Sequence, residues 1–172
     1  LGVDVTQYYR GAQILRGFDD EARGLVSEEM IENGVKLHLG TNILEMQKVD
    51  GGIRVISTNG HDEVFEQVMF ATGRAPNTQD MGLEAVGVEL GRNGKVLVDD
   101  YSQTKVPSIY AVGDVTDRVN LTPVAIREGM AFVETVFNGN PTQPDHELIP
   151  TAILTQSEMG TVGLREEGAG GE

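Results

Sequence analysis

The chain has 172 residues, of which 39% are hydrophobic, with a formal net charge of −14 at pH 7 and no cysteine. This length suits one ordinary domain or pieces of two, and the negative charge argues against nucleic acid and anionic membrane surfaces as partners. The lack of cysteine excludes disulfides, thiolate metal sites and thiol chemistry within the chain, and no apolar run approaches the ~18 residues of a membrane span.

The N-terminal part of the sequence predicts a β-loop-α-β unit. Residues 3–9 are rich in β-formers and indicate a strand. Residues 20–33 predict a helix, since they begin with acidic side chains and are followed by Gly34 at the place of a C-cap. Residues 35–39 would form the next parallel strand.

The pattern then changes to that of an antiparallel meander. Asp50-Gly51 and Asn59-Gly60 are tight-turn signals between β-rich runs, so residues 42–65 predict three antiparallel strands. Residues 68–72 are an unbroken apolar run, which is typical of a strand buried on both faces.

Glycine and proline in residues 73–77 interrupt this pattern and mark the first predicted domain boundary. Beyond it we expect a short helical stretch at residues 83–86, a turn at Asn93-Gly94 and a strand at residues 96–98. Residues 109–112 predict a buried strand that stops at Gly113-Asp114.

A second helix is predicted from Thr122 to about Phe137. Thr122 is the expected N-cap and Pro123 the first helical residue, where a missing N–H costs nothing. Apolar residues recur at helical spacing, and Gly139 would end the helix; they are Ile126, Met130, Val133 and Phe137.

The C-terminal part reads as a linker followed by the start of a further domain. Residues 140–144 are the linker and the second predicted boundary, and residues 151–155 and 160–164 predict strands. The glycine-rich residues 168–171 are typical of a disordered tract.

Gly113-Asp114 is the first candidate ligand site. A strand that ends in glycine lets a ligand approach the backbone, and the Asp114 carboxylate can accept hydrogen bonds from ligand hydroxyls. The positive end of the helix at Thr122 would point at the same ligand. From spacing alone, this segment is equally typical of a plain strand-to-helix connection.

Arg10 and Arg16 follow the first strand and are the second candidate site. Two guanidinium groups suit a phosphate ligand, although two exposed arginines can also be simple surface charge. The three histidines, His38, His61 and His146, are isolated in sequence, and we interpret them as surface or packing residues without a metal.

Residues 110–129, including L-T-P-V-A, resemble the second flavin-contacting segment of the pyridine nucleotide–disulfide oxidoreductases, and within that family the glutathione reductases. The resemblance implies that Asp114, after Gly113, binds the ribityl chain of FAD. It also implies that the helix start at Thr122 and Pro123 faces the flavin ring.

Two further segments carry the same resemblance. The spacing of Arg10 and Arg16 is similar to that of the NADPH-selective reductases, which implies that they bind the 2′-phosphate. Residues 71–77 are similar to the family's A-(T/I)-G-R-x-P-N signature, which implies that Gly73 and Arg74 contact the cofactor.

The resemblance implies an α/β fold in three pieces. Residues 1–77 would be a partial Rossmann-like NADPH domain with a β-meander, residues 78–144 the segment that completes the FAD domain, and residues 145–172 the start of an α+β dimer-interface domain. The glycine-rich turn, the redox cysteine pair and the catalytic His–Glu pair are expected outside this chain, so no catalytic residue is assigned within it.

The intact protein is expected to be a cytoplasmic homodimer that uses FAD to reduce glutathione disulfide with NADPH, whereas this chain alone should be inactive. Met130 stands where several glutathione reductases carry a substrate-contacting arginine. Trypanothione reductase, another flavin disulfide reductase or a catalytically inert remnant therefore remain alternatives.

Overall fold

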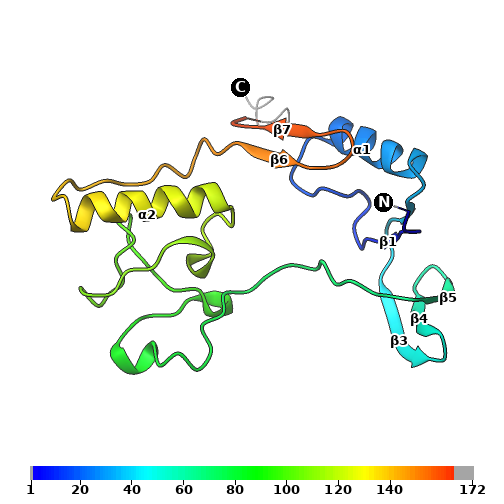
Figure 1. Ribbon diagram of the computed structural model, residues 1–172, viewed down its shortest axis with the longest axis horizontal. Coiled ribbons are helices and arrows are strands. Elements are labelled where there is room, and N and C mark those ends of the chain that lie inside the picture. The colour runs from blue at the N-terminus through cyan, green and yellow to red at the C-terminus, as the bar shows by residue number, and fades with distance from the viewer. Residues whose placement is uncertain (1, 165–172) are drawn as a thin grey trace. The chain divides into compact units, whose positions relative to one another are not determined.

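The computed structural model of the chain describes residues 2–164 and shows an α/β protein (Figure 1). These residues form two compact units. One contains the described residues up to Ala71 together with those from Pro150, and the other is Thr72–Ile149. Within residues 2–164, no helix combines the length and hydrophobicity needed to cross a membrane. The predicted disordered tract at 168–171 lies outside the described residues.

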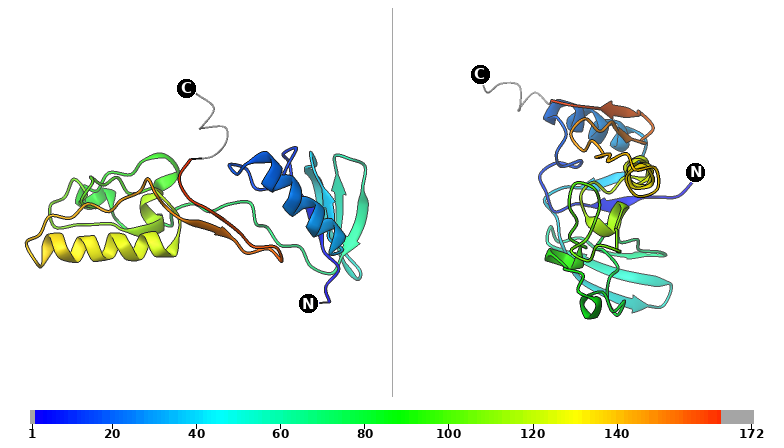
Figure 2. Two further views of the ribbon diagram at one scale, coloured as in Figure 1. Left: turned by 90° about the horizontal axis from the view of Figure 1, so that it is seen from above. Right: turned by 90° about the vertical axis from the view of Figure 1, so that its left-hand side faces the viewer.

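The first unit contains the β-loop-α-β arrangement that the sequence predicts. Strand β1 (Thr6–Tyr8) pairs in parallel with β2 (Lys36–His38), so that Tyr8 lies opposite His38. Helix α1 (Asp20–Glu32) connects them and packs against β2 (Figure 2). Asn33 is the C-cap of this helix. Gly34 follows it with φ +92°, a backbone conformation that glycine adopts without strain.

The predicted antiparallel meander is also confirmed. Strands β3 (Ile43–Val49), β4 (Gly52–Ser57) and β5 (Asp62–Phe65) pair in the order β3-β4-β5. Gly52 is required at the first turn, because a Cβ there would lie 2.3 Å from the carbonyl oxygen of Phe65.

The prediction of a buried strand at residues 68–72 is wrong. Met69 is 87% exposed and Phe70 66% exposed, and no backbone hydrogen bond within residues 2–164 involves this run. Hydrophobicity alone does not make a strand; it also needs a neighbouring strand to pair with, and the described part of the chain places none beside this run.

The last two strands are confirmed in the place that the sequence indicates. Strand β6 (Thr151–Ile153) pairs antiparallel with β7 (Met159–Thr161), and Ala152 lies opposite Gly160. They form a two-stranded hairpin of the first unit.

The second unit is built from loops and short helical turns around one long helix. The turns are η1 (Glu84–Val86), η2 (Arg92–Gly94) and η3 (Gly113–Thr116), and the helix is α2 (Thr122–Val136). Its small apolar core is made of Val88, Val96, Val124 and Ala131.

The strands predicted at 96–98 and 109–112 are not formed. Each is reduced to a single bridge, Leu90 with Val96 and Gln103 with Tyr110. Loop hydrogen bonds take up the neighbouring backbone groups instead: the N–H of Val96 donates to the carbonyl of Val115, and that of Ala111 to Ser102. Residues 96–98 and 109–112 are thus apolar segments that pair with no extended strand.

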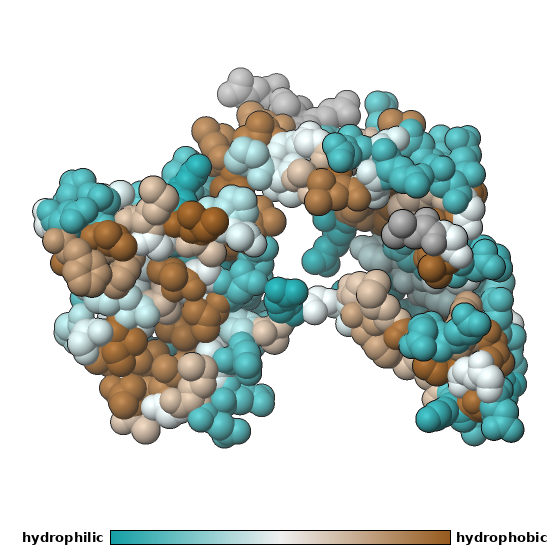
Figure 3. Space-filling model, viewed as in Figure 1, coloured by the Kyte–Doolittle hydropathy of each residue, from teal (hydrophilic) through white to brown (hydrophobic). Residues whose placement is uncertain are grey.

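Helix α2 presents its apolar stripe to the outside. Ile126, Met130, Val133 and Phe137 are all exposed, whereas the buried positions of the helix are Val124, Glu128 and Ala131. Figure 3 shows hydrophobic residues on the surface of the molecule. The helical spacing was a sound prediction of the helix, but it did not identify the face that packs on the rest of the unit.

Candidate functional site

The Gly113-Asp114 turn lies at the start of η3, which packs against α2. Gly113 is buried and has φ +73°, and a Cβ at this position would lie 3.1 Å from the Cβ of Ala125. Glycine therefore lets the turn approach the first turn of α2 closely. The space beside Gly113 is thus taken by Ala125 of α2, and the predicted close approach of a ligand at this glycine stays a prediction.

Asp114 and Arg74, two residues that the sequence proposes as cofactor contacts, lie together in the second unit. Nη1 of Arg74 is 3.5 Å from Oδ2 of Asp114, and the two side chains are 78% and 43% exposed. At this distance and exposure the ion pair is weak. The Asp114 carboxylate is therefore accessible to a ligand. Gly73, directly before Arg74, has φ +126° and is exposed.

Helix α2 begins one residue earlier than predicted. Its N-cap is Leu121, with extended backbone angles (φ −131°, ψ 135°) and no side-chain capping bond, and Thr122 is already helical. The predicted Thr122 cap is thus wrong, since the cap residue must leave the helical conformation and Leu121 does so. Thr122 and Pro123 are both exposed, which leaves the start of the helix open to a ligand.

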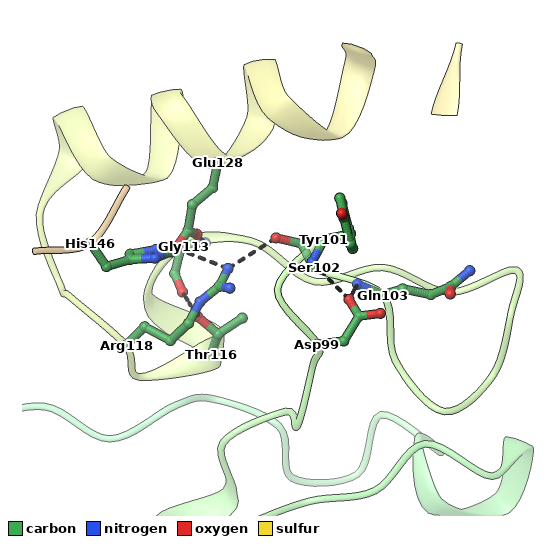
Figure 4. Close-up of polar contacts among 9 residues, drawn as sticks. All are labelled: Asp99, Tyr101, Ser102, Gln103, Gly113, Thr116, Arg118, Glu128 and His146. Carbon is green, nitrogen blue, oxygen red and sulfur yellow. Dashed lines mark hydrogen bonds and ion pairs between the residues drawn. The ribbon is translucent and has the colours of Figure 1, made fainter. Parts of the chain in front are cut away.

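A buried polar cluster, which the sequence analysis missed, supports this turn (Figure 4). The carboxylate of Glu128 is 1% exposed; its Oε2 accepts a hydrogen bond of 2.5 Å from the N–H of Gly113. Its Oε1 lies 2.9 Å from Nη2 of Arg118 and 2.7 Å from Nε2 of His146. We call Glu128, Arg118 and His146 the Glu128 cluster.

The arginine of the cluster is held in turn by two hydroxyl groups. Arg118 donates from Nη2 to Ser102 at 3.0 Å and from Nε to Thr116 at 3.3 Å. Ser102 is fixed in a loop in which Asp99 accepts the backbone N–H groups of Tyr101 and Gln103 (Figure 4).

One sequence signal could have revealed this cluster. Val124, Glu128 and Ala131 share one helix face, so a charged residue stands among the residues that the helix buries. A buried carboxylate requires cationic partners, and Arg118 and His146 are available in the same part of the sequence. His146 is thus a packing histidine as predicted, but it is not isolated.

The loop between β1 and α1 carries Arg10 and Arg16, both exposed. Arg23 of α1, also missed, supports this loop by donating to the carbonyl of Ile14 at 2.7 Å and to that of Gln13 at 3.0 Å. Since those carbonyls lie between the two candidate arginines, Arg23 fixes the path of the chain between them.

His38 and His61 are likewise not isolated, because the meander brings them together. The ring centroids of His38 and His61 are 4.2 Å apart, and the ring of Tyr8 stacks on His38 with a centroid distance of 5.1 Å. We call these three rings the aromatic cluster. Burial, and secondarily the charge of Glu63, raises the pKa of Tyr8. This aromatic cluster joins β1 and β2 to the meander and is consistent with a packing role.

Comparison with known proteins identifies the family. Residues 1–129 match the profile described as pyridine nucleotide-disulphide oxidoreductase. The chain belongs to this family. Family membership accounts for the α/β fold and implies a flavin and a pyridine nucleotide as cofactors.

Individual family members resemble the chain over nearly its whole length. It is 48% identical over 166 residues to the glutathione reductase of Burkholderia cepacia, covering 96% of this chain and 37% of that protein. It is 44% identical over 163 residues to the trypanothione reductase of Leishmania donovani, covering 94% and 33%. The crystal structure of LpdA from Mycobacterium tuberculosis matches with a TM-score of 0.84 at 28% identity, covering 96% and 36%. The chain thus spans about a third of the length of these relatives.

The residues of the turn fit a flavin nucleotide. The Asp114 carboxylate is exposed enough to accept hydrogen bonds from sugar hydroxyls. The exposed N-terminus of α2 favours negative charge on a neighbouring group. Both features lie in the second unit, in which η3 packs against α2.

Proposed function

We propose that this chain is an internal part of an FAD-dependent reductase that transfers electrons from NADPH to glutathione disulfide. The observation that carries the proposal is the Gly113-Asp114 turn, which is packed on α2 and leaves an accessible carboxylate beside an exposed helix start. Asp114 would hold the ribityl chain of FAD, and Thr122 and Pro123 would face the flavin. FAD, when bound, relays electrons from the nicotinamide nucleotide to a cysteine pair outside this chain.

The choice of NADPH rests on Arg10 and Arg16. Both are exposed on the loop that follows β1, and Arg23 holds the chain between them. In a dinucleotide fold this strand end meets the adenosine ribose, where NAD-binding proteins use an acidic side chain. Here two guanidinium groups follow Tyr9 and suit a 2′-phosphate. Gly73 and Arg74 would complete the cofactor contacts.

The wider organisation is part of the same proposal. Residues 1–77 would belong to the NADPH domain, residues 78–144 to the FAD domain and residues 145–172 to a dimer-interface domain. The last assignment rests on the linker at residues 140–144 in the sequence, since the structure groups the β6–β7 hairpin with the first compact unit. We infer a cytoplasmic homodimer.

A second candidate is the reduction of trypanothione disulfide. It is favoured by the 44% identity to the Leishmania donovani enzyme and by residues 113–119, G-D-V-T-D-R-V, which are similar to the corresponding segment of trypanothione reductases. The two activities would share every cofactor contact proposed above.

The test is a steady-state assay of the full-length protein with NADPH and each disulfide. We expect NADPH oxidation that depends on glutathione disulfide and exceeds the rate with trypanothione disulfide. A higher kcat/KM for trypanothione disulfide would establish the second candidate. No oxidation with either disulfide, in a preparation that contains FAD, would refute both.

A further inference from the structure

We propose that Glu128 is a positioning residue of the FAD site, which fixes the backbone on which Asp114 stands. This inference rests on the proposed function, since it assumes that Asp114 contacts the cofactor. It concerns a residue that lies one helical turn beyond Val124 and that cannot itself reach solvent, being 1% exposed.

Side chains hold both peptide groups that flank Gly113. The N–H of Gly113 donates to Oε2 of Glu128 at 2.5 Å, and its carbonyl accepts from the hydroxyl of Thr116 at 2.8 Å. Arg118 closes the ring, because it contacts both the Glu128 carboxylate and the Thr116 hydroxyl. The backbone that leads into Asp114 therefore has little freedom.

Asp114 itself remains outside this ring. Its carboxylate is 43% exposed, and its interaction with Arg74 at 3.5 Å is the only ion pair found for it within residues 2–164. The Glu128 cluster thus fixes the direction of the side chain through the main chain and leaves the carboxylate oxygens for a ligand.

The buried carboxylate of Glu128 carries an energetic cost. Burying a carboxylate is unfavourable unless it is paired, and apolar residues of similar volume often stabilise a fold equally well. Here Arg118, His146 and the Gly113 N–H all compensate one carboxylate. What an apolar side chain could not supply is an acceptor for the Gly113 N–H, and this acceptor is what the proposal assigns to Glu128.

The experiment compares variants of the full-length holoenzyme. Glu128→Met removes the acceptor, Glu128→Gln keeps an oxygen that can accept from Gly113, and Asp114→Ala removes the ligand contact itself. Glu134→Gln is the matched control, since Glu134 lies on the same helix and bonds Asn138 and Asn140 without touching the turn. FAD dissociation, the visible circular dichroism of the flavin and the unfolding temperature of the apoprotein are measured for each.

We expect Glu128→Met to release FAD about tenfold to a hundredfold faster. This is the cost of losing one hydrogen bond to a charged group, namely the bond between the misplaced Asp114 carboxylate and FAD. The visible circular dichroism of the flavin in Glu128→Met should also change. Glu128→Gln should retain FAD much better than Glu128→Met does. Glu134→Gln should match the wild type in all three measurements. If Glu128→Met does not fold, the double variant Arg118→Met with Glu128→Met, which leaves no unpaired buried charge, takes its place.

Two outcomes would overturn the inference while leaving the proposed function intact. One is that Asp114→Ala releases FAD faster and the Glu128 variants do not. The other is that FAD loss in the Glu128 variants only parallels lower apoprotein stability, without rescue by glutamine. A wild-type protein that retains no FAD would instead overturn the proposed function, and the inference with it.

Discussion

At the scale of single residues, the proposed ligand contacts are more exposed than the groups that orient them, of which Glu128 is buried and Arg23 half-buried. Asp114 and Arg10 can both reach a ligand, whereas Glu128 and Arg23 bind backbone groups near them. This division is physically reasonable, because a contact residue must remain available for the ligand while its supporting partner must be immobile.

Arg10 and Arg16 are expected to select NADPH over NADH in the full-length protein. A hydrogen bond to a charged group contributes roughly 1.5–3 kcal/mol, so Arg10→Ala should lower kcat/KM for NADPH about tenfold to a hundredfold. NADH lacks the 2′-phosphate, and its kcat/KM should change little. Steady-state kinetics with both nucleotides measures this, with Arg92→Ala, an exposed arginine of η2, as the control. Equal losses for both nucleotides would contradict the two-arginine interpretation.

At the scale of elements, local sequence signals place turns and helices well but do not determine which face is covered. The meander follows from its two glycine turns, and Gly52 is sterically required in one of them. Helix α2 forms as expected, yet its apolar stripe is exposed and a glutamate lies on its buried side. Cross-strand pairs then add small local contributions to the meander.

The pair of Arg54 in β4 and Asp62 in β5 gives the meander a dependence on pH. Arg54 forms two hydrogen bonds to the carboxylate, and these lower the pKa of Asp62. A lowered pKa in the folded state means that the contribution is present above the ordinary carboxyl pKa and is lost as the pH falls through the lowered value. Both groups are near the surface, so the effect should be small.

We expect Asp62→Asn to lower the midpoint denaturant concentration of unfolding slightly near neutral pH, where the Asp62 carboxylate is charged. In strong acid the wild-type carboxyl is protonated as well, so the two proteins should have the same midpoint. Chemical denaturation across a pH series measures it, and carboxyl-detected NMR gives the pKa directly. Glu66→Gln, at an exposed position directly after β5, should show no such pattern. An Asp62 carboxyl that titrates at its ordinary value would disprove the pairing in solution.

At the scale of the whole molecule, the chain comprises two compact units and spans about a third of the length of the relatives it matches. Its exposed apolar residues include Met69 and Phe70 of the unpaired run and Phe137 at the end of α2. Arg10, the proposed contact of NADPH, belongs to the first unit, and Asp114, the proposed contact of FAD, belongs to the second.

The 172-residue chain alone is expected to have no disulfide reductase activity. It contains no cysteine, and reduction of a disulfide by this family's chemistry needs a thiol pair to receive electrons from the flavin. NADPH oxidation with glutathione disulfide should therefore equal the rate without protein, while the full-length protein provides the positive control. A rate above that of the protein-free reaction would refute this expectation.

Some of the fold and site could be predicted from local rules, and some could not. The β-loop-α-β unit, the meander, the final hairpin and the extent of α2 depend on spacing, glycine and proline, which are visible along the sequence. The strands expected at 68–72, 96–98 and 109–112 failed because a strand requires a partner that hydrophobicity does not specify. The charged Glu128 on the buried face of α2 is visible along the sequence, but its pairing with His146, 18 positions away, is not.

The sequence by itself determined the family, because glycine, proline and charged residues at fixed spacing carry that information, and the proposed cofactor contacts rest on the same residues. Only the tertiary structure decided which side of α2 is buried and that His38 meets His61. It alone showed that the Gly113 N–H donates to Glu128, 15 residues along the chain. The physical reason is that burial and pairing are properties of neighbours in space, which the folded chain brings together from separate parts of the sequence.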